Sequence, residues 1–223
     1  MFWTTGAVLV GWFAVAAILA SFNVYQASSD RWPIIQYGIA VPVLIGGFVL
    51  WRSAAVSRLI DLIPQRWIIA VQFYRALGVI FLILYASGKL SGLFARPAGA
   101  GEVAVGLLAP VVAWSAMRER RTSARAIWLW NVLGIADLCI AMGTGFLTSP
   151  SALQLGVFDR SNELIAAFPL VLIPTFLVPL SFLLHFVSLI KLSRAMPRLK
   201  ASGTSTRAPC ILDDRIGATG PSL

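Results

Sequence analysis

The chain has 223 residues, of which 58% are hydrophobic and only 12% are charged. Soluble domains hold about 45–50% apolar and about 25% charged residues, so this composition excludes a water-soluble fold, and with it a disordered chain, a collagen and a disulfide scaffold. The formal net charge of +9 is high for so apolar a chain. It could reflect binding to nucleic acid, binding to anionic lipid, or the orientation of the chain in a membrane.

Six stretches of the sequence are long and apolar enough to cross a membrane, which takes roughly 20 mostly apolar residues per helix. The predicted spans are residues 4–26, 34–51, 67–87, 97–116, 126–147 and 168–190. No alternation of polar and apolar residues over about ten positions recurs, as a transmembrane barrel would need. The predicted fold class is therefore all-α, a polytopic membrane helical bundle with six transmembrane helices.

The first predicted span could instead be a cleaved signal peptide, which would leave five helices. Residues 1–5 lack the positive charge that opens such peptides, and the apolar run is longer than their usual hydrophobic region. The pattern favours a retained membrane anchor.

Loops rich in basic residues alternate along the chain with loops poor in them. Lys and Arg are retained on the cytoplasmic side of a membrane. One set of loops and the C-terminal tail carry thirteen: Arg52, Arg58, Arg66, Arg118, Arg120, Arg121, Arg125, Lys191, Arg194, Arg198, Lys200, Arg207 and Arg215. The opposite set carries four: Arg31, Lys89, Arg96 and Arg160. This alternation predicts an N-in/C-in topology with both termini in the cytoplasm, and it removes the need for nucleic acid as a partner. Residues 118–125 are expected to attract anionic lipid headgroups at the cytoplasmic face.

The chain is expected to divide into two parts. Residues 1–194 form the six-helix transmembrane domain, and residues 195–223 form a disordered basic cytoplasmic tail, because Ser, Thr, Gly and Pro replace the apolar runs there. Cys139 lies in mid-membrane and Cys210 in the tail, so the two are not expected to pair.

The third and fifth predicted spans resemble each other. Residues 74–79 (YRALGV) align with residues 130–135 (WNVLGI), and a Pro-bearing helix follows each span. The match indicates either a parallel repeat of two-helix hairpins or a chance similarity between two low-complexity membrane segments. In a true repeat, Arg75 corresponds to Asn131 and Phe81 to Asp137.

Ionisable residues inside a membrane span are costly, usually face the bundle interior and mark functional candidates. Four are found here: Arg75, Glu102, Asp137 and His185. With a rise of about 1.5 Å per residue, Arg75 lies about 13 Å and Asp137 about 18 Å from the cytoplasmic ends of their helices. The sequence therefore predicts an Arg75–Asp137 ion pair, with Glu102 as the second choice of partner.

Neighbouring polar groups are expected to complete this intramembrane centre. Gln72 and Tyr74 are placed to supply hydrogen bonds to Arg75, and Asn131 would be the equivalent of Arg75 in a true repeat. Two interpretations remain open: the pair only locks two helices together, or it forms a solvated site where the charges meet a ligand or an ion.

The fourth predicted span carries one ionisable residue among small residues. Glu102 shares a row with Ala98, Gly106 and Pro110, and small residues let helices approach closely, so Glu102 is expected to face another helix. It could line an outward-facing opening, or be hydrated and idle.

The last span places Ser181, His185 and Ser188 along one helix face, after Pro174 and Pro179. An interior Pro removes a backbone hydrogen bond and kinks the helix. The span is therefore either a kinked gating helix with a titratable His or an ordinary packing helix with a hydrogen-bonded His.

No catalytic motif accompanies these residues. The sequence has no CxxC, HExxH, Walker or GxSxG pattern, and its single His cannot provide two axial ligands to a haem. Four scattered ionisable groups are too few for a metal cluster. We therefore expect no cofactor, no metal and no catalytic residue, and an enzyme is the less favoured class.

Residues 72–114 resemble DoxX-like helical bundles and other bacterial multi-pass inner-membrane proteins of undefined activity. The marks are residues 74–78 (YRALG), 88–90 (GKL) and 97–102 (PAGAGE). The resemblance implies a helical bundle in a bacterial inner (plasma) membrane and singles out Arg75 and Glu102. This sequence departs from that group in having six predicted spans where the group generally has four.

Two functional hypotheses follow. The first is a non-enzymatic membrane protein that binds or passes a small solute or ion through the intramembrane polar centre. The second is an accessory or assembly subunit of a membrane complex, as a homo-oligomer or beside a partner subunit, in which the polar pairs only hold helices together.

Overall fold

The computed structural model describes residues 2–26, 34–118, 121–149 and 162–205, and all secondary structure in these ranges is helical. The elements are α1 (Phe2–Ser21), α2 (Ile35–Arg52), α3 (Ala54–Leu62), α4 (Gln65–Ala70), η1 (Val71–Gly78), α5 (Val79–Ala86), α6 (Gly92–Ala116), α7 (Arg121–Thr148), η2 (Glu163–Ala166), η3 (Ile173–Leu177) and α8 (Val178–Ser205).

Six helices in the described ranges are long and apolar enough to cross a membrane, which confirms the number expected from the sequence. They are Trp3–Ser21, Ile35–Arg52, Gln65–Ala86, Gly92–Ala116, Thr122–Thr148 and Ile173–Pro197. The fourth and fifth begin about one turn earlier than hydropathy indicated: the fifth includes the polar residues 122–125, and the fourth continues across Arg96 to Gly92. These features are those of a multi-pass membrane protein.

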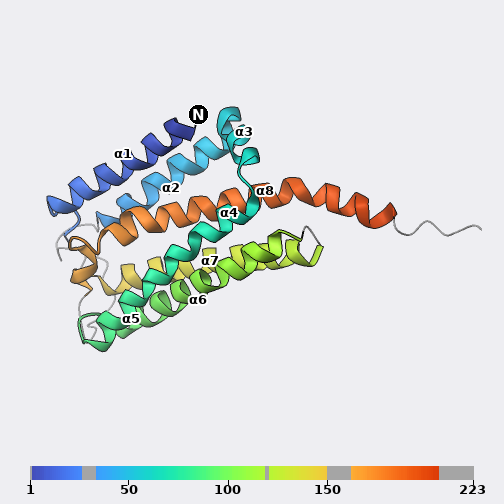
Figure 1. Cartoon of the computed structure of the whole chain (residues 1–223). Helices are drawn as coiled ribbons and strands as arrows, with labels where there is room; N and C mark the ends of the chain where they lie inside the picture. The colour runs from blue at the N-terminus through green and yellow to red at the C-terminus, as the bar shows by residue number, and fades with distance from the viewer. Residues whose placement is uncertain (1, 27–33, 119–120, 150–161, 206–223) are drawn as a thin grey trace, which may run out of the picture.

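Helix α8 occupies the middle of the bundle (Figure 1). It packs against α2 on one side and against α4 and α7 on the other. Helix α6 packs against η1, α5 and α7. Helix α1 is peripheral, and the rings of Trp12 and Phe13 hold it against Phe176, with ring centroids 4.8 and 5.1 Å apart. Most residues with buried polar side chains belong to η1, α6, α7 and α8, and Ser91, Asn162 and Thr175 lie outside these elements.

The third span changes its winding in the middle. Residues Val71–Gly78 form a 3₁₀-helix between α4 and α5. A 3₁₀-helix has three residues per turn, so side chains three apart lie directly above one another. Gln72, Arg75 and Gly78 are therefore aligned on one face, and all three are buried. The aligned segment 130–135 is continuous α-helix in α7, so the two spans of the expected repeat differ at this point.

The sixth span begins with an irregular turn, at the prolines expected to distort it. Ile173–Leu177 is a π-helix with Pro174 near its start, and Pro179 is in the first turn of α8. The Thr175 hydroxyl donates to the Val171 carbonyl at 2.7 Å, which supports the wide turn. The span starts at residue 173 and not at 168, because each proline removes an N–H group from helical bonding and three prolines fall within eleven residues.

Small residues bring η1 and α6 into backbone contact. A Cβ atom on Gly106 would overlap the backbone of Arg75 and Ala76, and a Cβ on Gly78 would overlap the Cβ of Glu102. The row Ala98, Glu102 and Gly106 is buried as expected, whereas Pro110 is exposed and does not belong to it. This close approach places the Glu102 carboxylate beside Arg75.

Two segments expected to be irregular contain helix. Residues Ala54–Leu62 form the short helix α3, capped by the Ser53 hydroxyl, and Arg194 binds its Asp61 at 2.8 Å. Helix α8 continues to Ser205, ten residues past the expected start of the tail, because extending a helix that is already formed needs no new nucleation. Residues 206–223 of the expected tail, and most of the 148–167 loop, lie outside the described residues.

The tight contact between η1 and α6 predicts that Gly106→Ala lowers stability. The added methyl forces the two backbones apart, at a cost of about 1–3 kcal/mol, and we expect a lower melting temperature of the protein in detergent. Gly47→Ala is the matched control, since nothing lies within 4 Å of a Cβ there. A Gly106→Ala protein as stable as the control variant would contradict the contact.

Candidate functional site

Arg75 holds two carboxylates at the centre of the bundle. Its Nε donates to Glu102 Oε2 at 2.8 Å and its Nη2 to Glu102 Oε1 at 3.1 Å, a bidentate pair. The same Nη2 donates to Asp137 Oδ2 at 2.6 Å. The expected Arg75–Asp137 pair is present, and Glu102, the second choice of partner, is bound as well. The Arg75 side chain has no exposed area, and those of Glu102 and Asp137 are 9% and 11% exposed.

The remaining donors of Arg75 point to the opposite side. Nη1 lies 2.9 Å from His185 Nε2 and 3.5 Å from the Gly134 carbonyl oxygen. A guanidinium has five N–H donors and no acceptor, and these contacts use all five. Arg75 therefore has no free N–H with which to bind an anionic ligand.

The contacts of His185 define its tautomer. Because Arg75 can only donate, His185 Nε2 must accept, which leaves the ring proton on Nδ1. Nδ1 donates to Asn131 Oδ1 at 2.9 Å. The imidazole is fully buried and packs against the Trp130 ring, with centroids 4.9 Å apart. His185 is thus a neutral side chain that orients Arg75, and it does not add a positive charge to the centre.

A chain of amide and hydroxyl groups continues from His185 toward the end of the bundle near α3. Asn131 Nδ2 donates to Ser188 Oγ at 2.9 Å, and Gln65 Nε2 donates to the same oxygen at 2.8 Å. Asn131 and Ser188 are fully buried. These bonds fasten α7, α8 and the start of α4 to one another and lock the orientation of His185.

The charges of the centre do not balance when both carboxylates are ionised. Arg75 supplies one positive charge, Glu102 and Asp137 supply two negative charges, and His185 is neutral. A net charge in a site of low dielectric constant is strongly unfavourable. Burial therefore favours either one proton shared by the two carboxyl groups or a cation bound beside them.

Glycines leave room for these groups. A Cβ on Gly101 would overlap the Asp137 carboxylate, and a Cβ on Gly134 would overlap the His185 ring. Both glycines face the centre from neighbouring helices, α6 and α7. The polar side chains fit only because the helix backbone lacks side chains at these two points.

Two sequence expectations about the centre are wrong in detail. Tyr74 does not bind Arg75. Its side chain faces α8, and its hydroxyl forms a hydrogen bond with Ser181 Oγ at 2.7 Å. Gln72 is fully buried one 3₁₀ turn from Arg75, but its amide has no hydrogen-bond partner among the described residues. Glu102 and His185 fill the positions around Arg75 that these two were expected to fill.

Sequence reasoning missed two contributors. The Gly134 carbonyl is a backbone group, and Gln65 lies 123 residues from Ser188 in the chain, so no local pattern could indicate either. The stripe of Ser181, His185 and Ser188 was visible in the sequence, and all three are buried. Among the described residues, no group of three His, Cys, Asp or Glu side chains could hold a metal ion.

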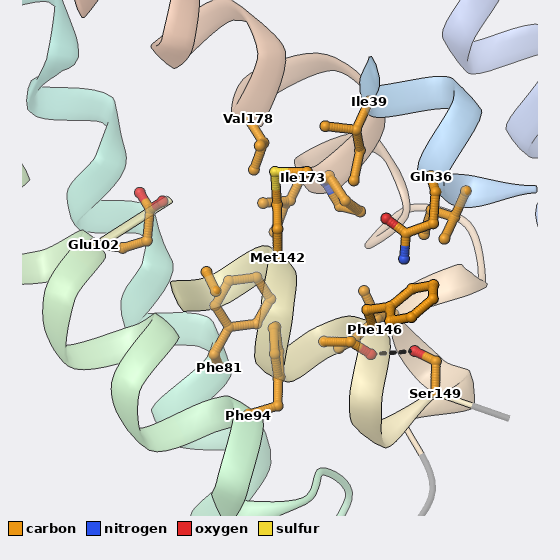
Figure 2. A pocket seen from close by; sticks show the side chains of 15 residues that line it. Gln36, Ile39, Phe81, Phe94, Glu102, Met142, Phe146, Ser149, Ile173 and Val178 are labelled. Atoms are coloured by element: carbon orange, nitrogen blue, oxygen red, sulfur yellow. Dashed lines mark hydrogen bonds between the residues drawn. The ribbon is translucent and has the colours of Figure 1, made fainter. Parts of the chain in front are cut away.

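A cavity of about 60 Å³ leads to the centre from the end of the bundle where α2 begins and α7 ends. Figure 2 shows Glu102 at one end of this cavity and Gln36, Phe146 and Ser149 at the other. Beyond Glu102, a second cavity of about 20 Å³ is lined by Arg75, Tyr74 and Ser181, among others. It is large enough for one water molecule, which needs about 10–15 Å³.

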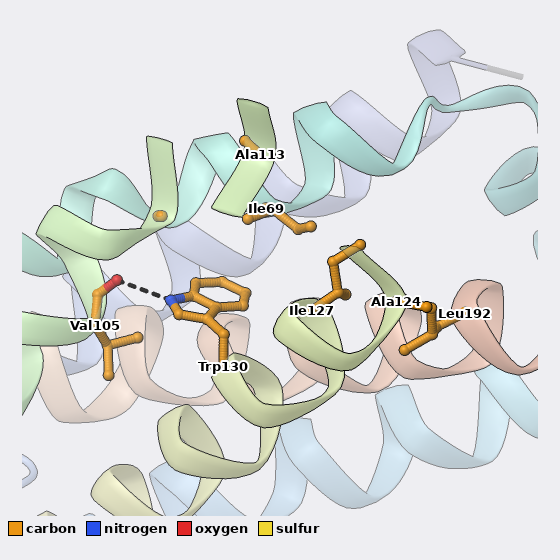
Figure 3. Packing of buried hydrophobic residues seen from close by; sticks show 8 residues of the cluster. Ile69, Val105, Ala113, Ala124, Ile127, Trp130 and Leu192 are labelled. Carbon is orange, nitrogen blue, oxygen red and sulfur yellow. Dashed lines mark hydrogen bonds between the residues drawn. The ribbon is translucent and has the colours of Figure 1, made fainter. Parts of the chain in front are cut away.

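The opposite end of the bundle is closed by an apolar cluster (Figure 3). Its buried members come from α4, α6, α7 and α8: Ile69, Val105, Ala109, Ala113, Ala124, Ile127, Trp130 and Leu192. The Trp130 indole N–H donates to the Val105 carbonyl at 3.1 Å, which ties α7 to α6. The cavity therefore reaches the polar centre from one end, whereas toward the other end the bundle holds this apolar cluster and the hydrogen-bonded chain of Asn131, Ser188 and Gln65.

One family model matches most of the chain. Residues 32–193 match the family model described as Domain of unknown function (DUF8737). The chain belongs to this family. The matched segment contains every residue of the polar centre and excludes α1. No curated protein and no solved structure matches the chain.

The geometry predicts that Arg75→Met is strongly destabilising. It leaves two buried carboxylates without a counter-charge, which costs about 3–5 kcal/mol. Adding Glu102→Gln and Asp137→Asn removes both charges, so the triple variant should recover most of the lost melting temperature. A triple variant no more stable than the single one would contradict the charge argument.

The unpartnered amide of Gln72 predicts that Gln72→Leu raises stability. A buried polar group without a hydrogen bond costs about 1–3 kcal/mol, and leucine has a similar volume. Thermal unfolding in detergent measures the change, with the exposed Gln26→Leu as the control. A lower melting temperature of Gln72→Leu would show that the amide has a partner.

Proposed function

We propose that this protein binds and passes a small solute or ion through the intramembrane polar centre, and that the ion is a proton held by Glu102 and Asp137. The observation that carries the proposal is the single guanidinium between two buried carboxylates. One negative charge is left over, and one proton neutralises it. Holding helices together needs no excess charge, and an excess charge is costly in a site of low dielectric constant.

Access to the centre supports exchange with one side of the membrane. The cavity of Figure 2 reaches Glu102, and the smaller cavity adjoins both Glu102 and Arg75. The apolar cluster of Figure 3 blocks the other side. This arrangement corresponds to one of the two states of an alternating-access cycle, open at one end and closed at the other.

The two irregular segments support a change between such states. The 3₁₀-helix η1 carries Arg75, and the π-helix η3 contributes Ile173 to both cavities. Segments of this kind inside longer helices often mark hinges. A shift at either one would alter both the cavity and the position of the guanidinium.

The orientation we propose is N-in/C-in, in a bacterial inner membrane. The open end of the cavity then faces away from the cytoplasm, because α2 begins and α7 ends on the side poor in Lys and Arg. The ion pair of Arg194 with Asp61 lies at the opposite end, where anionic lipid headgroups would meet the basic loops.

Proton flux into proteoliposomes tests the proposal. The full-length protein is reconstituted with a pH-sensitive dye inside the vesicles, and a potassium diffusion potential drives proton entry. We expect flux well above that of empty vesicles, reduced at least tenfold by Asp137→Asn. Asp61→Asn is the matched control, because it removes the same charge from an exposed site at the other end of the bundle.

Two results would overturn the proposal. The first is a folded wild-type protein with no flux above that of empty vesicles. The second is an Asp137→Asn variant that keeps full flux. Either result, combined with co-purification of a fixed partner subunit or a homo-oligomer, would favour the accessory or assembly role.

A further inference from the structure

The cavity that ends at Glu102 also has the properties of a ligand site. We propose that it binds a small organic ammonium ion, with three or four short alkyl substituents on nitrogen, which replaces the proton of the carboxyl pair. The replacement rests on the proposed function. The preference for a cation rests only on the cavity and its charge.

The walls of the cavity suit an alkylated cation. Phe81, Phe94 and Phe146 line it, and the first two rings meet edge to face with centroids 5.2 Å apart. Aromatic rings attract a cation through the negative potential of their faces, and alkylammonium ions are commonly recognised in this way. Met142 adds a polarisable and adaptable side chain.

The charge of the centre selects against other ligands. Glu102 is the one ionisable residue among the described residues that line the cavity, and it belongs to a site with surplus negative charge. An anion would be repelled and would find no free N–H on Arg75. A neutral solute cannot replace the proton that compensates the surplus, whereas a monocation can.

The same reasoning couples the ammonium ion to the proton. The charged or titratable groups that face the carboxyl pair are Arg75 from η1 and His185 from α8, with the Tyr74 hydroxyl beside the smaller cavity. Arg75 remains charged and its contact keeps His185 neutral. A bound cation therefore changes the occupancy of a proton on Glu102 or Asp137.

The size of the cavity limits the ligand. A volume of about 60 Å³ restricts the ligand to a small ion whose short arm extends toward the open end of the cavity. Gln36 and Ser149 provide polar groups at the far end (Figure 2). A hydroxyl on the arm could bind there while the ammonium lies near Glu102.

Calorimetry with three isosteric probes tests this inference on the full-length protein in a maltoside detergent. The probes are choline, its neutral carbon isostere 3,3-dimethylbutan-1-ol and the anion 3,3-dimethylbutanoate. We expect choline to bind at least tenfold more tightly than the alcohol, and the anion not to bind. Titrations in two buffers of different ionisation enthalpy count the protons released, and we expect close to one per choline.

Variants locate the effect. Glu102→Gln and Asp137→Asn each remove the surplus charge, so either should reduce the preference for choline over the alcohol at least tenfold. Asp61→Asn should leave it unchanged. Asp137 does not line the cavity, so its variant tests charge without altering the walls. The comparison of the three probes on the wild-type protein needs no variant to fold.

Each outcome is decisive. Equal binding of choline and the alcohol, or no binding of either, overturns the ammonium site and leaves the proton proposal to its flux test. Choline binding without proton release supports the site and contradicts the proton on the carboxyl pair. Phosphocholine serves as the probe for a lipid headgroup, and tighter binding of it than of choline would overturn a free ammonium ion as the ligand.

Discussion

The centre of this bundle depends on one constraint. A single guanidinium must compensate two carboxylates in a medium of low dielectric constant. Arg75 cannot lose its proton, and it uses every N–H it has. The geometry of four helical segments is therefore tied to one side chain. The two negative charges exceed the positive one, and the centre gains stability when it takes up a proton or a cation.

Close packing of backbones makes this arrangement possible. Gly78 and Gly106 bring η1 and α6 together, while Gly101 and Gly134 leave space for the Asp137 carboxylate and the His185 ring. Without large side chains at these points, the polar groups come within hydrogen-bonding distance and exclude lipid. The stability of the bundle thus comes from van der Waals contact and polar pairs, as expected where hydrophobic burial contributes little between helices.

Irregular winding decides which groups reach the centre. In η1 the three-residue repeat stacks Gln72, Arg75 and Gly78 on one face. The two positions aligned in the expected repeat, Arg75 and Asn131, bind opposite nitrogens of the same His185 ring. The repeat itself stays a prediction, but its two aligned positions both contact His185.

The sequence by itself determined the membrane character, the six apolar helices and the ionisable residues of the interior, because each of these follows from local composition and from the cost of burying charge. The depth of Arg75 and Asp137 even indicated their pairing. Only the tertiary structure decided that Glu102 completes the pair, that His185 and Asn131 orient Arg75, and that Tyr74 and Gln72 do not. Those contacts depend on helix rotation, on the 3₁₀ winding and on glycines of neighbouring helices. The periodicity of a single segment does not indicate any of these.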